Sequence, residues 1–132
     1  MKMRHLLWLA SAVASVQAGC QVTPDANGHV DMGAATSIGS DAFRDCTALV
    51  SVSMPNVTSI GYYAFFGCTS LALTSLPPGV TTIGTSAFEG CTSLRSVTIP
   101  SSVTEIGLKA FCGCRLPELT RDAIRAINSE AV

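Results

Sequence analysis

Hydrophobic and polar positions recur along the chain with a period of 22 or 23 residues. Each copy contains the motif I-G-x-x-A-F, and a cysteine follows the phenylalanine by three residues. The isoleucines that open the four copies are Ile38, Ile60, Ile83 and Ile106. A period in this range is typical of stacked coils, because a single copy cannot bury its own apolar face. The sequence therefore predicts a repeat solenoid, and its 132 residues are enough for one domain.

A second apolar pattern, between the motifs, predicts short strands. Residues two apart on a strand point to the same side, so Val97 and Ile99 are expected to face inward and Thr98 outward. Pro100 ends the strand because it cannot donate to a hydrogen-bonded ladder. We expect parallel strands on one face of the solenoid and irregular or short helical turns on the other. The expected strands are residues 29–33, 51–55, 73–77 and 96–100.

Equivalent positions of successive coils are expected to form columns through the core. Isoleucine, phenylalanine and cysteine supply the apolar columns, and alanine stays small to leave room for the phenylalanine rings. The glycine after each isoleucine is expected to adopt a positive φ in a tight bend. These glycines are Gly39, Gly61, Gly84 and Gly107.

Residues 1–18 have the layout of a secretory signal peptide. Lys2 and Arg4 precede an apolar run, 6–16, and small residues ending at Ala18 follow it. The alternative is a buried or membrane-spanning helix, but a span needs about 20 apolar residues. We therefore expect cleavage after Ala18 and a secreted or cell-surface protein. No other segment is long and apolar enough to cross a membrane.

The rest of the chain divides into caps and repeats. Residues 19–37 are expected to form an N-terminal cap that includes the first strand, and 38–117 to hold about 3.5 copies of the repeat. Residues 118–132 are expected to form a C-terminal capping helix and tail, since the ends of a solenoid need to be sealed. A helix that docks a partner is the alternative for this last segment.

Charge and composition exclude several functions. Without Lys2 and Arg4, six basic residues remain against nine acidic ones, and they form no basic patch that would indicate nucleic-acid binding. His29 is the only histidine after residue 18, and the carboxylates are scattered. The sequence therefore indicates neither an enzyme nor a cofactor. Cys91, Cys112 and Cys114 lie near one end, but a zinc site needs a fourth ligand, so no metal is expected.

The repeat resembles the BspA-type leucine-rich repeat family. The resemblance rests on I-G-x-x-A-F-x-G-C-T-S-L-x-S-V-T-I-P-x-S-V-T-x-I-G, which residues 83–107 contain almost whole, and it covers roughly 28–114. It implies a leucine-rich repeat solenoid that is secreted or surface-attached, takes part in adhesion or protein binding, and is not an enzyme. The copy number is small for the family, which limits the binding surface.

Four cysteines occupy one column of the repeat: Cys46, Cys68, Cys91 and Cys114. Adjacent strands lie about 4.8 Å apart, within the Cα separation that a disulfide tolerates. Bridges from Cys46 to Cys68 and from Cys91 to Cys114 are therefore one interpretation for an oxidising compartment. Buried free thiols, which pack as small apolar groups, are the other, and the recurrence of cysteine at a packing position favours them.

Cys20 and Asn56 are candidate modification sites. Gly19 and Cys20 match the end of a bacterial lipobox, in which a lipid on the cysteine would anchor the protein to a membrane. Gln17 stands where leucine is usual, so cleavage after Ala18 is the favoured interpretation. Asn56 begins an N-x-T sequon in the turn after a strand, which predicts an exposed N-glycosylation site in a eukaryotic host.

The outward strand positions form the candidate interaction face. They are Asp31, Ser53, Ser75 and Thr98, with Arg95 beside them. Four strands make a face only about 15–20 Å across, so we expect weak or multivalent contact with a protein, or with a matrix or surface glycan. A surface-coat repeat without a specific ligand is the first alternative. A binder of ice or crystal surfaces is the second, because Thr58, Thr81 and Thr104 form a ladder of hydroxyl groups.

Overall fold

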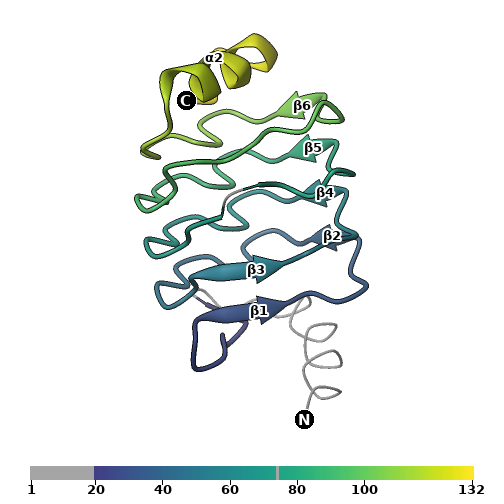
Figure 1. Ribbon diagram of the computed structural model, residues 1–132, viewed down its shortest axis with the longest axis vertical. Helices are drawn as coiled ribbons and strands as arrows, with labels where there is room; N and C mark the ends of the chain where they lie inside the picture. The colour runs from purple at the N-terminus through teal and green to yellow at the C-terminus, as the bar shows by residue number, and fades with distance from the viewer. Residues whose placement is uncertain (1–19, 74) are drawn as a thin grey trace.

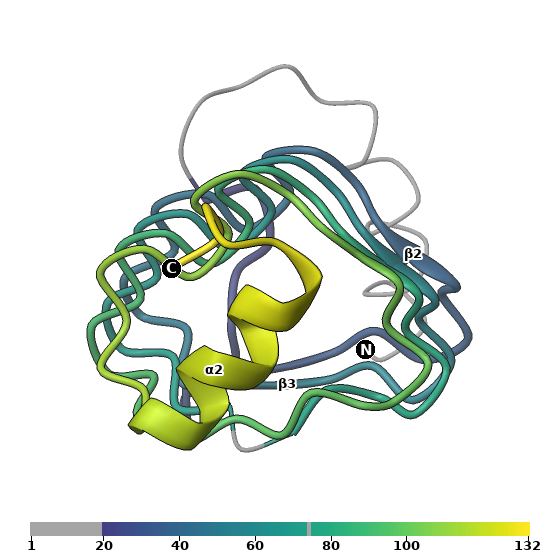
Figure 2. The same cartoon turned by 90° about the horizontal axis from the view of Figure 1, so that it is seen from above.

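The computed structural model describes residues 20–73 and 75–132. The predicted signal peptide, residues 1–18, lies outside the described residues. The chain winds into coils that stack along the longest axis of the molecule (Figure 1). Seen from above, successive coils nearly superimpose (Figure 2), so each repeat position forms a column along that axis.

One face of the stack contains the strands that the sequence predicts, in shortened form. Strand β1 (His29–Asp31) pairs in parallel with β3 (Ser51–Ser53). In the next two coils, the described residues contain one parallel bridge, between Ser75 and Thr98. A proline stands at the same position in all three coils, at Pro55, Pro77 and Pro100, and ends each segment because it cannot donate to a ladder.

A second sheet lies where the sequence analysis expected only turns. It has four parallel strands in the order β2 (Ser37–Ile38), β4 (Ser59–Ile60), β5 (Thr82–Ile83) and β6 (Glu105–Ile106). The isoleucines pair in register, and the following glycine extends the ladder: the Gly61 N–H donates to the Ile38 carbonyl oxygen at 2.9 Å. Each repeat therefore contributes to strands on two faces of the coil.

The repeat columns fill the space between the two sheets. The phenylalanine rings stack face to face, with centroids 5.0–5.2 Å apart and planes within 9° of parallel. All four rings are buried, as are the isoleucines before them and Leu49, Leu71 and Leu94. The alanines next to the inner rings, Ala64 and Ala87, are fully buried, which agrees with their expected role as small spacers.

The glycine that follows each isoleucine has a different role from the one expected. Left-handed φ values occur two residues later, at Tyr63 (57°) and Ser86 (56°), and the glycines have none. A Cβ on Gly84 would lie 2.7 Å from the backbone of Gly61 and Tyr62. Real Cβ atoms do not approach so closely, so glycine is required because adjacent coils stack backbone against backbone.

The two ends of the stack are closed differently. Cys20 forms a disulfide with Cys46, which fastens the first residues to the first coil, and Val22 is buried beside it. At the other end α2 (Glu118–Ile127) lies across the last coil (Figure 2) and buries Ile124. The helix begins after Pro117, which supplies no side-chain cap.

Ion pairs connect side chains of α2 on its outer surface. Arg125 Nη1 lies 2.8 Å from Glu118 Oε1 and 2.9 Å from Asp122 Oδ1. The hydrogen bond from Arg125 lowers the pKa of Glu118. Leu119 is 85% exposed, so the helix packs on the core through a narrow stripe around Ile124.

Candidate interaction site

The candidate interaction face combines residues from the first sheet and its extension. Asp31 pairs with Ser53, and Ser75 pairs with Thr98, so the positions that the sequence aligned are aligned in space. Asp31, Ser75 and Thr98 are exposed, whereas Ser53 is half-buried. Asp31 Oδ1 also accepts a hydrogen bond of 2.8 Å from the Gly33 N–H. That bond fixes the carboxylate in its turn.

A neighbouring column on this face includes an apolar residue that the sequence analysis did not single out. Val50 follows the buried Leu49 as Arg95 follows the buried Leu94, so the two side chains occupy equivalent positions. Val50 is 42% exposed and Arg95 is also exposed. The face therefore changes from apolar to basic between the first coil and the third.

The cysteine column corrects one of the two interpretations given above. Cys46 pairs with Cys20, and Cys68, Cys91 and Cys114 are buried free thiols. The bridges from Cys46 to Cys68 and from Cys91 to Cys114 are therefore wrong. Each free thiol of the column instead donates to a phenylalanine carbonyl oxygen of the preceding coil, as Cys68 Sγ does to Phe43 at 2.9 Å.

Burial also controls the chemistry of these thiols. It raises the pKa of Cys68 and of Cys114 to about 12, and that of Cys91 further still. A thiolate is the reactive form of cysteine, so the column is inert at neutral pH. Cys112, which is half-buried and outside the column, is the remaining free cysteine among the described residues.

The disulfide also bears on the alternative of a lipid anchor at Cys20. A lipid would be attached through the sulfur of Cys20, and that atom is bonded to Cys46. The anchor and the disulfide are therefore mutually exclusive.

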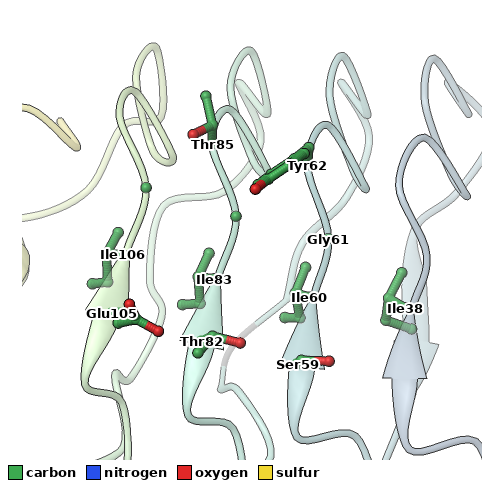
Figure 3. A pocket seen from close by; sticks show the side chains of 12 residues that line it. Ile38, Ser59, Ile60, Gly61, Tyr62, Thr82, Ile83, Thr85, Glu105 and Ile106 are labelled. Carbon is green, nitrogen blue, oxygen red and sulfur yellow. The ribbon is translucent and has the colours of Figure 1, made fainter.

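A groove lies outside the second sheet, on a face that the sequence analysis did not consider. Its volume is about 480 Å³, and matching positions of three successive coils line it. They are Ser59, Ile60, Gly61 and Tyr62; Thr82, Ile83, Gly84 and Thr85; and Glu105, Ile106 and Gly107, with Ile38 at one end. Figure 3 shows Tyr62 reaching from its own coil toward that of Thr85. The sequence feature that could have indicated this groove is Tyr62, an aromatic residue at an exposed position of the repeat.

A search of protein families gives a match over most of the chain. Residues 32–131 match the BspA type leucine rich repeat region in six copies. The chain belongs to this family. The matched region extends beyond the predicted repeats, 38–117, at both ends. Among curated proteins, none matches the sequence.

Solved leucine-rich repeat proteins have similar structures. A leucine-rich repeat protein from Bacteroides ovatus is 30% identical with a TM-score of 0.63, over 67% of this chain and 26% of that one. A leucine rich cell surface protein from Faecalibacterium prausnitzii is 27% identical with a TM-score of 0.43, over 73% of this chain and 38% of that one. The chain thus spans about a quarter of the length of the Bacteroides protein.

The threonine ladder of the repeat is engaged in hydrogen bonds within the protein. Thr58, Thr81 and Thr104 each donate a hydroxyl hydrogen bond of 3.2–3.3 Å to a carbonyl oxygen of the preceding coil. The acceptors are Thr36, Thr58 and Thr81. The donors that an ice-binding ladder would present are therefore used to join coils.

Another contact between coils lies at the outer turns. The guanidinium of Arg44 lies over the rings of Tyr63 and Phe66, 5.1 and 5.0 Å from their centroids. The same group pairs with Asp41 at 3.1 Å. This cation–π cluster connects the first coil with the second.

The remaining candidate sites can be placed briefly. Asn56 is exposed, and its amide donates to the Gly33 carbonyl oxygen at 3.4 Å; its glycosylation stays a prediction. Among residues 20–73 and 75–132, no group of three histidine, cysteine or carboxylate side chains is arranged to hold a metal ion. In the same part of the chain, no helix has the length and hydropathy to cross a bilayer.

Proposed function

We propose that this leucine-rich repeat chain is a non-catalytic interaction module, secreted or displayed at a cell surface, that binds a protein through the candidate interaction face. The observation that carries the proposal is the alignment of Asp31 with Ser53 and of Ser75 with Thr98 on one face of the stack. Side chains repeated at the strand spacing present a regular surface, as in other solenoids with extended binding faces. Beside this alignment, Val50 and Arg95 give the face one apolar and one basic side chain.

The size of the face determines the mode of binding. Four positions about 4.8 Å apart make a surface well below the roughly 800 Å² that each partner contributes to a standard interface. A single copy is therefore expected to bind weakly, and several copies on one surface are expected to bind by avidity.

The test compares the secreted wild-type chain with two variants. Each protein is assayed in two forms, attached at high density to beads and as a free monomer. In the first variant Ser75→Lys and Thr98→Lys place two long cations on the face. In the second, Ser101→Lys and Asn56→Lys add the same charge in exposed turns. We expect purified matrix and host-surface proteins to bind the displayed wild type and the second variant, and not the first. Equal binding by both variants would move the site to another face.

A further inference from the structure

The groove outside the second sheet has the features of a ligand site. Two walls of side chains flank a floor of half-exposed glycines, Gly61, Gly84 and Gly107. Ser59, Thr82 and Glu105 form one wall, and Tyr62 and Thr85 form the other (Figure 3). The volume of about 480 Å³ falls within the range of small-molecule sites, roughly 300–1,000 Å³.

Tyr62 is the residue that gives the groove a chemical preference. Tyr62 is 61% exposed, so its ring is accessible to a ligand in the groove. The equivalent residues of the first and third coils are Ser40 and Thr85, so the repeat does not require an aromatic residue there. An exposed ring offers an apolar face, and its hydroxyl adds a donor and acceptor at the tip.

The charge of the groove excludes anionic ligands. Glu105 is the one charged residue among those that line it, and no lysine or arginine is present there to bind phosphate, sulfate or carboxylate groups. The other polar lining side chains carry hydroxyl groups, which bind both donors and acceptors. A ligand rich in hydroxyl groups and without charge matches this set.

The sheet beneath the groove also argues against a peptide strand as the occupant. Strands β4 and β5 are each paired on both sides, so their ladders are complete. An extended peptide binds a sheet by adding to an edge, whereas the middle of the groove is formed by strands already paired on both sides. Recognition there must come from side chains and from a stacking surface.

We propose that the groove binds a neutral oligosaccharide, with the C–H face of one pyranose ring against Tyr62 and sugar hydroxyls bonded to Glu105 and Thr82. The groove lies over the second sheet, and β2 of that sheet is on a different face of the coil from β3 (Figure 2). The oligosaccharide site can therefore be tested independently of the proposed protein-binding face.

The test uses the full secreted chain and a panel of soluble hexasaccharides. The neutral probes are β-1,4-glucan, β-1,3-glucan, α-1,4-glucan, β-1,4-mannan and chitin fragments, and the charged probe is a polygalacturonate fragment. Titration calorimetry and saturation-transfer NMR are expected to detect at least one neutral probe with a Kd below about 1 mM. The charged probe is not expected to bind.

Variants identify the site of binding. Tyr62→Ala should weaken binding at least about tenfold, whereas Tyr62→Phe keeps the ring and should stay within about threefold of wild type. Glu105→Gln should weaken binding about threefold or more, because an amide is a poorer acceptor than a carboxylate. Leu119→Ala removes an exposed apolar side chain from α2 and should change nothing. The proposal is overturned if no neutral probe binds, if the charged probe binds more tightly, or if Tyr62→Ala binds like wild type.

Discussion

The side-chain amide of Asn128 donates a hydrogen bond of 2.8 Å to the carbonyl oxygen of Ile106. In the coil before, the N–H of Gly107 makes the equivalent bond to Ile83, also at 2.8 Å. The same equivalence holds three residues further along: the Phe111 N–H donates to the Ala131 carbonyl oxygen as the Phe88 N–H donates to that of Ala110, both at 2.7 Å. The segment after α2 thus closes the stack by reproducing the backbone pairing of one more coil.

Loss of the Asn128 amide should therefore destabilise the C-terminal end. Asn128→Ala leaves the Ile106 carbonyl oxygen without its partner and should lower the free energy of unfolding by about 1–2 kcal/mol. Asn128→Asp should cost at least as much, because a carboxylate cannot donate. Urea unfolding followed by circular dichroism measures the change, and Ser129→Ala, at an exposed neighbour, is the control. An Asn128→Ala midpoint equal to that of wild type would contradict the capping role.

The repeat made most of the fold predictable from sequence. Residues that recur every 22 or 23 positions occupy the same environment in each coil, so their columns follow from a single alignment. The buried phenylalanines and the pairing of Ser75 with Thr98 are examples. The family model and the Bacteroides structure agree with that architecture.

The features that the sequence did not predict depend on contacts outside the repeat or on exact backbone geometry. Cys20 belongs to no repeat, so its pairing with Cys46 could not be aligned with anything. The second sheet was missed because each of its strands has only two residues, too few for an alternating pattern. The groove depends on the close approach of glycine backbones, which a residue pattern does not measure.

The Cys20–Cys46 disulfide should contribute strongly to stability. It closes a loop with a sequence separation of 26, for which chain entropy predicts about 3.5 kcal/mol. Cys20→Ala should lower the urea midpoint accordingly. It should also leave Cys46 as a buried thiol, like Cys68 in the next coil. Dithiothreitol should lower the midpoint of the wild type and not that of the variant. Mass spectrometry of the untreated protein should find four free thiols, and finding Cys20 carrying a lipid would overturn the pairing.

The buried thiols should resist alkylation in the folded protein. At pH 8, iodoacetamide should modify Cys112 first, whereas Cys68, Cys91 and Cys114 should react only when urea unfolds the chain. Peptide mapping after timed labelling measures the order. Rapid labelling of Cys91 in the folded state would show that the column opens far more readily than its burial implies.

The same thiols should make the protein less stable at alkaline pH. Burial raises the pKa of Cys68 and Cys114 from an ordinary value of 9.0 to about 12, so the folded state holds protons that the unfolded chain has lost. Their contribution is complete below pH 9.0 and is lost as the pH rises toward about 12, by at most about 1.4 kcal/mol per pH unit for each thiol. Urea unfolding at pH 8 and pH 10 tests this. Cys68→Ala should show a shallower decline than wild type, and an equal decline would assign the effect to other groups.

Adjacent coils stack closely at Gly84 but not at Gly79, so alanine substitutions at these two glycines should differ in their effect on stability. A methyl group on Gly84 would lie 2.7 Å from the backbone atoms Gly61 C and Tyr62 N, which cannot move without separating the coils. Gly84→Ala should therefore lower the free energy of unfolding by about 1–3 kcal/mol, the usual cost of overpacking.

Gly79→Ala is the matched control, because its added Cβ would meet nothing nearer than Thr58 Cγ2 at 3.7 Å. That variant should stay within about 0.5 kcal/mol of wild type. Both changes remove the same backbone freedom from the unfolded chain, so the difference between their urea midpoints isolates the steric term. Equal midpoints would mean that the spacing of the coils at Gly84 is looser than the stacked backbone indicates.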